Sequence, residues 1–176
     1  VAMSAGNIDY RLALASACTN LGQFDRAREH LAAARQIAPD NAEVHYRLAR
    51  VLAEQGETGE AAVHYDRAAV LDDGLAARAA DDRRRYQRRY LSEADTRLDE
   101  GRLDEATASL RAAEDLLPLG VEGLVLEGRL AGAEGDITGA IASYRRALDR
   151  DPGRRDATEH LAGALGNLGR AHYEAG

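Results

Sequence analysis

Few residues of this 176-residue chain could support chemistry. The five His are scattered, and a metal site would need several of them, or other ligands, to converge. Cys18 is the single cysteine, so it can form neither a disulfide within the chain nor a thiolate metal cluster. No Ser lies in a nucleophile-elbow pattern. We therefore predict no catalytic residue, no metal site and no cofactor, and we expect that the protein is not an enzyme.

A glycine motif is the other candidate for chemistry. Gly, four variable residues and then Ala recur four times, as GQFDRA, GETGEA, GRLDEA and GDITGA, starting at Gly22, Gly56, Gly101 and Gly135. A phosphate-binding loop also opens with Gly and four free positions, but it needs a following Lys and a preceding strand. All 23 basic residues are Arg, and no strand pattern precedes the glycines. The phosphate-loop hypothesis is therefore rejected.

The same glycines mark an internal repeat. Gly22 to Gly56 and Gly101 to Gly135 are each 34 residues apart, whereas Gly56 to Gly101 is 45, eleven more. When the four glycines are aligned, four other positions of the repeat, here called columns, also hold similar residues. Seven residues before each glycine the residue is small (Ala15, Ala49, Ala94, Gly128), and five residues after it stands Ala (Ala27, Ala61, Ala106, Ala140). Nine residues after each glycine the residue is large (Leu31, Tyr65, Leu110, Tyr144), and seventeen residues after it stands Pro or Asp (Pro39, Asp73, Pro118, Pro152). All three prolines of the chain fall in one column, which makes chance an inadequate explanation.

Each column has a physical reason. Gly can end a helix in the left-handed conformation that other residues resist. Small residues let two helices approach closely, and large residues fill the gaps between them. Pro cannot continue a helix and also displaces its predecessor from helical geometry. Each unit is therefore predicted to be a helix, a tight turn, a second helix and a stop.

The period and the columns resemble the tetratricopeptide repeat family over residues 8–154 and again in NLGRAHYEAG (167–176), which ends on Gly176. The resemblance implies an all-α fold, a right-handed α-solenoid of antiparallel helix pairs. Glu93 and Glu127 depart from it, because the family usually has a large apolar residue there, as at Leu14 and Leu48. Pentatricopeptide repeats are the near rival, but they have 35 residues and are usually basic RNA binders.

The predicted organisation has four parts: two repeats in 8–74, a helix extension or linker in 75–86, two repeats in 87–154, and a terminal or truncated-repeat helix in 155–176. The eleven inserted residues equal about three helical turns, so they can lengthen a helix without rotating its buried face. We predict one long helix from Leu75 to Glu100, whose first half projects beyond its shorter neighbours. A separate short helix or a linker is the alternative.

The resemblance also implies a binding site, because first helices of tetratricopeptide arrays line a concave groove for a peptide or partner segment. The groove-facing positions here are Leu12, Ser16, Thr19 and Asn20; Tyr46, Arg50 and Glu54; Arg88, Leu91, Asp95 and Asp99; and Val125 and Arg129. Members that clamp a chaperone's terminal carboxylate use a Lys and two Asn in the first two units. Those positions hold Leu12, Ser16 and Arg47, which disfavours a chaperone adaptor, although Arg88 keeps the charge at one clamp position.

Two histidines occupy equivalent positions in successive units. His30 and His64 are one period apart, and we expect both to be surface residues on the outer side of second helices.

A dense basic cluster, RRRYQRRY, runs from Arg83 to Tyr90. In one interpretation it is a solvated helix face, neutralised by nearby acids such as Asp81, Asp82, Glu93 and Asp95. In the other it is a second docking patch, formed by Arg84, Arg85, Tyr86, Arg89 and Tyr90. Its ligand would be an acidic protein, a second copy of the chain, or nucleic acid stacked on the two Tyr rings.

Our prediction is a non-catalytic scaffold that binds another protein or a peptide, with self-association as a further possibility and a nucleic-acid-binding helical repeat as the alternative. The net charge of −7 argues against nucleic acid and anionic membranes. No apolar run approaches the roughly 20 residues that span a bilayer. The start, VAMSAGNIDY, lacks the pattern of an intact signal peptide. We expect a cytoplasmic location; a removed leader or a larger parent protein is the alternative.

Overall fold

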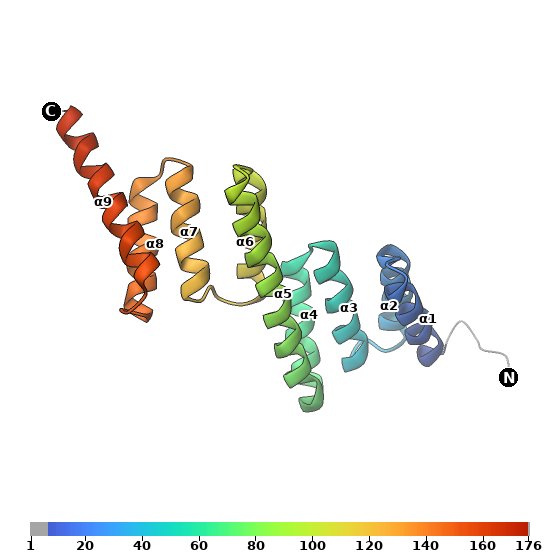
Figure 1. The fold of residues 1–176 in the computed structure, drawn as a ribbon. Coiled ribbons are helices and arrows are strands. Elements are labelled where there is room, and N and C mark those ends of the chain that lie inside the picture. The colour runs from blue at the N-terminus through green and yellow to red at the C-terminus, as the bar shows by residue number, and fades with distance from the viewer. Residues whose placement is uncertain (1–6, 176) are drawn as a thin grey trace. The chain divides into compact units, whose positions relative to one another are not determined.

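The structure, a computed structural model, describes residues 7–175. Over this range every regular element is a helix (Figure 1). The helices are α1 (Ile8–Asn20), α2 (Phe24–Ile37), α3 (Ala42–Gln55), α4 (Thr58–Leu71), α5 (Asp73–Asp99), α6 (Leu103–Leu116), α7 (Val121–Ala133), α8 (Ile137–Arg150) and α9 (Arg155–Ala175). The chain divides into two compact units, and the division falls between Gln87 and Arg88 within α5. The all-α prediction is confirmed.

Tight glycine turns join the first and second helices, as predicted. Gly22, Gly56, Gly101 and Gly135 have φ of 70°, 84°, 74° and 86°, and no other kind of residue in the described range has a positive φ. These angles lie in the left-handed region, where a Cβ atom is unfavourable. The four recurring glycines therefore fix the positions of the turns. Gly176, predicted as a fifth turn, lies outside the described residues.

The repeat columns form the core of each unit. The Ala residues five positions after the glycines are buried, with 0% exposure at Ala27, Ala61 and Ala106 and 1% at Ala140. The large column, exemplified by Leu31 and Tyr65 at 0% exposure, is buried as well. In the first unit α1 packs on α2, α2 on α3 and α3 on α4. In the second, α6 packs on α7, α7 on α8, and both α7 and α8 on α9.

One long helix occupies the region of the insertion. Its first half does not simply project beyond its neighbours, because Leu75, Ala79 and Tyr86 are buried. The Tyr86 hydroxyl donates to Glu54 Oε1 at 2.7 Å, and Arg83 donates to Asp66 Oδ1 at 2.6 Å. Residues 73–87 are thus packed against α3 and α4 within the first unit.

The two departures from the family pattern are occupied by ion pairs. Glu93 is half-buried and lies 3.3 Å from Arg97 and 3.6 Å from Arg89. Glu127 accepts a hydrogen bond from Arg146 at 3.0 Å. Each carboxylate is therefore neutralised by Arg at a place where an apolar side chain would otherwise pack.

A buried histidine pair joins α3 to α4. His45 and His64 are each 7% exposed, so the expectation that His64 is a surface residue is wrong. His45 Nε2 lies 2.7 Å from the carbonyl oxygen of Pro39, which can only accept. His45 Nδ1 lies 2.8 Å from His64 Nδ1, so one of these two nitrogens donates a hydrogen bond to the other. His30 is half-buried and lies 3.4 Å from the Arg11 guanidinium.

Gly128 lies where α7 packs closely against α8, so a substitution there can test the close packing of helix pairs. A Cβ atom added to Gly128 would lie 2.4 Å from Cε1 of the Tyr144 ring on α8, whereas one added to Gly163 in α9 would meet nothing within 4 Å. We expect Gly128→Ala to destabilise the protein by about 1–3 kcal/mol through overpacking. Gly163→Ala should stabilise it by about 0.4–1 kcal/mol through helix propensity. Denaturant melts measure both, and equal effects would contradict the close contact.

The histidine pair predicts a pH dependence of stability. Burial, and then the neighbouring His45 and Arg35, lower the pKa of His64 below its ordinary value of 6.5, although Glu60 opposes them. The unfolded chain therefore binds this proton more readily, so the free energy of unfolding should fall as the pH drops below about 6.5. Urea melts at pH 7.5 and about 5.5 measure the difference, which His64→Gln should reduce. The exposed His172→Gln variant is the control, and an unchanged pH slope in His64→Gln would contradict the assignment.

Candidate protein-binding pockets

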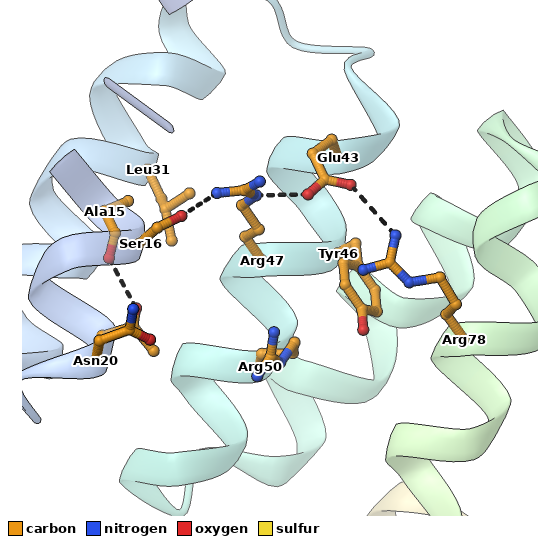
Figure 2. A pocket seen from close by; sticks show the side chains of 10 residues that line it. Ala15, Ser16, Asn20, Leu31, Glu43, Tyr46, Arg47, Arg50 and Arg78 are labelled. Carbon is orange, nitrogen blue, oxygen red and sulfur yellow. Dashed lines mark hydrogen bonds and ion pairs between the residues drawn. The ribbon is translucent and has the colours of Figure 1, made fainter. Parts of the chain in front are cut away.

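The first helices of the first unit surround a pocket of about 280 Å³ (Figure 2). It is lined by Ala15, Ser16, Thr19, Asn20, Leu31, Glu43, Tyr46, Arg47, Arg50 and Arg78. All but Leu31, which comes from α2, belong to α1, α3 or the first half of α5. The pocket thus lies on the face of the helices that the repeat register predicted for binding.

Five residues predicted to face a groove line this pocket: Ser16, Thr19, Asn20, Tyr46 and Arg50. Two others do not. The carbonyl of Leu12 accepts a hydrogen bond from Arg47 Nη1 at 3.1 Å, and Glu54 accepts one from the Tyr86 hydroxyl. Both are therefore engaged in holding helices together rather than in lining the pocket.

Glu43 organises the polar side of the pocket. Arg47 Nε donates to Glu43 Oε1 at 2.5 Å, and Arg78 Nη1 lies 4.0 Å from Glu43 Oε2. Arg47 also donates to the Ser16 hydroxyl. Figure 2 shows the resulting chain of polar contacts, which runs from Ser16 on α1 through Arg47 and Glu43 on α3 to Arg78 on α5. The polar groups of three helices are thereby connected.

Tyr46 is the aromatic centre of the pocket. Its hydroxyl donates to Asp82 Oδ2 at 2.7 Å, and the guanidinium carbons of Arg78 and Arg50 lie 4.6 and 5.9 Å from its ring centroid. Burial and the hydrogen bond to Asp82 raise the pKa of Tyr46, so its hydroxyl stays protonated. Burial opposes the charge of Arg50, but Asp82 and the neighbouring Tyr residues offset this, and the pKa of Arg50 is raised. Arg50 therefore remains a cation beside a neutral ring.

Glu43 and Arg78 were missed as pocket residues from the sequence. Arg78 lies in residues 75–86, for which the sequence predicts a helix extension or a linker and not part of a repeat. Its packing within the first unit is what brings it to the pocket.

The second unit has a pocket of its own, of about 360 Å³. It is lined by Arg88, Leu91, Ser92, Asp95, Glu122, Val125, Leu126, Arg129, Arg154 and Asp156, and it includes the predicted positions Arg88, Leu91, Asp95, Val125 and Arg129. Asp99 does not line it, but accepts from Arg129 Nη2 at 2.6 Å.

Ion pairs neutralise most of the second pocket. Arg129 is bonded to both Asp95 and Asp99, and Arg154 donates to the two oxygens of Asp156 at 2.7 and 2.9 Å. Arg88 is exposed, and the structure gives it no ion pair within the described range. With three Arg and three acids along its wall, this pocket is electrically balanced.

The basic cluster is largely neutralised as well. Four of its Arg have acidic neighbours: Arg83 with Asp66, Arg84 with Asp81, Arg85 with Asp82 and Arg89 with Glu93. These contacts match the interpretation as a solvated helix face.

The two Tyr residues of the proposed docking patch require a correction. Tyr86 and Tyr90 are 2% and 7% exposed, so their rings cannot form the docking surface predicted from the sequence. Burial and the hydrogen bond to Glu54 raise the pKa of Tyr86 to about 12. Both rings follow the apolar stripe of α5, and this places them in the core.

Other features that could indicate chemistry are lacking in the described part of the chain. No group of three or more His, Cys, Asp and Glu in residues 7–175 could hold a metal ion. Within the same range, no helix has both the length and the apolar character needed to cross a membrane. Cys18 is buried in α1.

Solved structures with likeness to the chain include PilF of Pseudomonas aeruginosa, at 19% identity, covering 93% of this chain and 69% of that one, with a TM-score of 0.44. A thermophilic tetratricopeptide repeat protein of Thermus thermophilus, TTC0263, has 22% identity, 90% and 99% coverage and a TM-score of 0.40. MamA of Desulfovibrio magneticus RS-1, from residue 41 to its end, has 17% identity, 99% and 90% coverage and a TM-score of 0.40. These scores are too low to carry a conclusion, and no curated protein matches the chain.

Family models give the clearer result. One tetratricopeptide repeat model matches residues 21–88, and another matches residues 91–155 and 125–176. Together they cover most of the chain, and their positions agree with the glycine turns and buried columns described above. The chain therefore belongs to the tetratricopeptide repeat family, whose members typically bind other proteins and are typically non-catalytic.

Proposed function

We propose that the chain is a non-catalytic scaffold that holds a segment of a partner protein in the pockets formed by its first helices. Family membership supports a role in protein–protein interaction in general. The observation that carries the finer proposal is the lining of each pocket, in which side chains from successive first helices converge around an apolar floor and leave polar groups accessible.

The chemistry of the two pockets suits a polypeptide ligand. In the first, Ser16, Thr19 and Asn20 can bond to a peptide backbone above a buried floor that includes Tyr46. In the second, Leu91 and Val125 are almost fully buried and form an apolar floor among charged neighbours. Such a mixture of a few polar groups and an apolar floor is typical of peptide recognition in grooves.

The nucleic-acid alternative has less support. Its stacking residues, Tyr86 and Tyr90, are buried, and most of the Arg cluster is paired with acids. The chain as a whole carries a net charge of −7. Electrostatic attraction to phosphate backbones is therefore weak.

Site-specific photo-crosslinking tests the proposal. A photoreactive amino acid is placed at Asn20 in the first pocket or at Ser92 in the second, because both side chains are exposed. We expect covalent adducts with a common partner protein from extracts of the source cells. The matched controls are Val63 and Val70 on α4, which are 65% and 78% exposed and line neither pocket. Adducts from the α4 positions alone would contradict the proposal.

A further inference from the structure

We infer that the first pocket binds acidic side chains from an internal segment of its partner, seated between Arg50 and Arg78 beside Tyr46. This inference rests on the proposed function, because it specifies the chemistry of a segment bound in that pocket. The observations behind it are the charge of the pocket and the incomplete bonding of two partly exposed Arg side chains.

The first pocket has an excess of positive charge that the second lacks. Its wall carries Arg47, Arg50 and Arg78 against a single acid, Glu43. The wall of the second pocket has equal numbers of Arg and acidic residues. On a chain of net charge −7, a pocket with more cations than anions is a local feature that favours an anionic ligand.

Two of the three guanidinium groups are incompletely bonded. Arg50 Nε is buried and makes no hydrogen bond in the described part of the chain, and Oδ2 of Asp82 lies 3.5 Å from it. That carboxylate already accepts from Tyr46 and also pairs with Arg85 at 3.2 Å. Arg78 has a 56% exposed side chain, and Glu43 lies 4.0 Å from it. The Arg50 side chain as a whole is 40% exposed, so a ligand carboxylate could reach the accessible part of its guanidinium group and that of Arg78, and could form shorter, charge-assisted bonds than these internal contacts provide.

The bonding of Arg47 argues for side-chain carboxylates rather than a chain terminus. The positions that some family members use to clamp a terminal carboxylate hold Leu12, Ser16 and Arg47 here. Arg47 is bonded to Glu43, to the Leu12 carbonyl and to the Ser16 hydroxyl. The remaining cations, Arg50 and Arg78, come from two different helices, so they can meet acids at separate places along one segment.

The floor of the pocket is closed. Ala15, Leu31 and Tyr46 line it but are 1%, 0% and 4% exposed, so they offer almost no apolar surface to a ligand. Recognition therefore rests on the cations, and a segment whose acids are separated by other residues could place its carboxylates on Arg50 and Arg78, which come from two helices.

The test uses a short fluorescein-labelled peptide in which Glu alternates with Leu, with its C-terminus amidated. Fluorescence anisotropy compares its binding to the full chain with that of the same peptide carrying Gln in place of Glu. We expect the Glu peptide to bind at least about tenfold more tightly, and its affinity to fall as salt rises from about 50 to about 500 mM. A version of the Glu peptide with a free C-terminus completes the set.

Variants locate the binding. Arg50→Gln with Arg78→Gln should weaken the Glu peptide by about tenfold or more, since each change removes a charge-assisted contact. Arg78→Gln alone, at an exposed side chain, should give part of this loss if the double variant misfolds. Arg111→Gln on the exposed face of α6, which lines neither pocket, is the matched control and should leave the affinity for the Glu peptide unchanged.

Several results would overturn the inference. Equal affinity for the Glu and Gln peptides, or no binding of either, would refute recognition of acids while leaving crosslinks at Asn20 as independent support for the scaffold. Binding of the free-terminus peptide alone would show that a terminal carboxylate is recognised instead. An equal loss in Arg111→Gln would show that the effect is due to net charge rather than to this pocket.

Discussion

The close approach of the two helices in each pair is the constraint on which the rest of the structure depends. It is possible because Ala27, Ala61, Ala106 and Ala140 occupy the contact and are completely or almost completely buried. At such positions even one added methyl group has nowhere to go in a close-packed interior. Because one face of each first helix is committed to this contact, its polar residues are displayed on another face, and there they form the pockets.

The register of the repeat explains how much could be predicted. Glycine turns, buried columns and half of the pocket residues follow from counting positions from the recurring glycines, because helical geometry fixes which side chains share a face. The prediction of pocket residues and of exposed residues failed where a contact joins helices at positions that the repeat does not relate. Arg78 is one such case, because residues 75–86 belong to neither of the flanking repeats and have no position in the repeat. His45 and His64 meet only through the pairing of α3 with α4, which a comparison of equivalent positions in successive units does not reveal.

Tyr86 and Tyr90 illustrate a different difficulty. A composition of Arg and Tyr suggests a recognition surface, yet the periodicity of the same helix places both rings on its buried stripe. The Tyr86 hydroxyl is satisfied by Glu54, so the ring can be buried without leaving its polar atom unpaired. Helical spacing was the better guide to these residues than their chemical type.

Charge distribution separates the two pockets. In the second, Asp95, Asp99 and Asp156 hold Arg129 and Arg154. In the first, Glu43 fixes Arg47 but lies far enough from Arg78 to leave that guanidinium accessible. The two pockets share one fold, and all their basic residues are Arg. The positions of individual acidic residues therefore decide that one pocket has balanced charges and the other favours anions.

The most direct test of this account is a nuclear magnetic resonance titration of the isotope-labelled chain with the amidated Glu and Leu peptide. The account predicts that the largest shift changes fall on the amides of Ser16–Asn20 and Glu43–Arg50 and on the side-chain Nε–H signals of Arg50 and Arg78. The exposed α4 positions Val63 and Val70 should remain unchanged. Changes concentrated on α2 and α4, with the Arg50 and Arg78 signals unmoved, would contradict the claim that the first helices form the binding face.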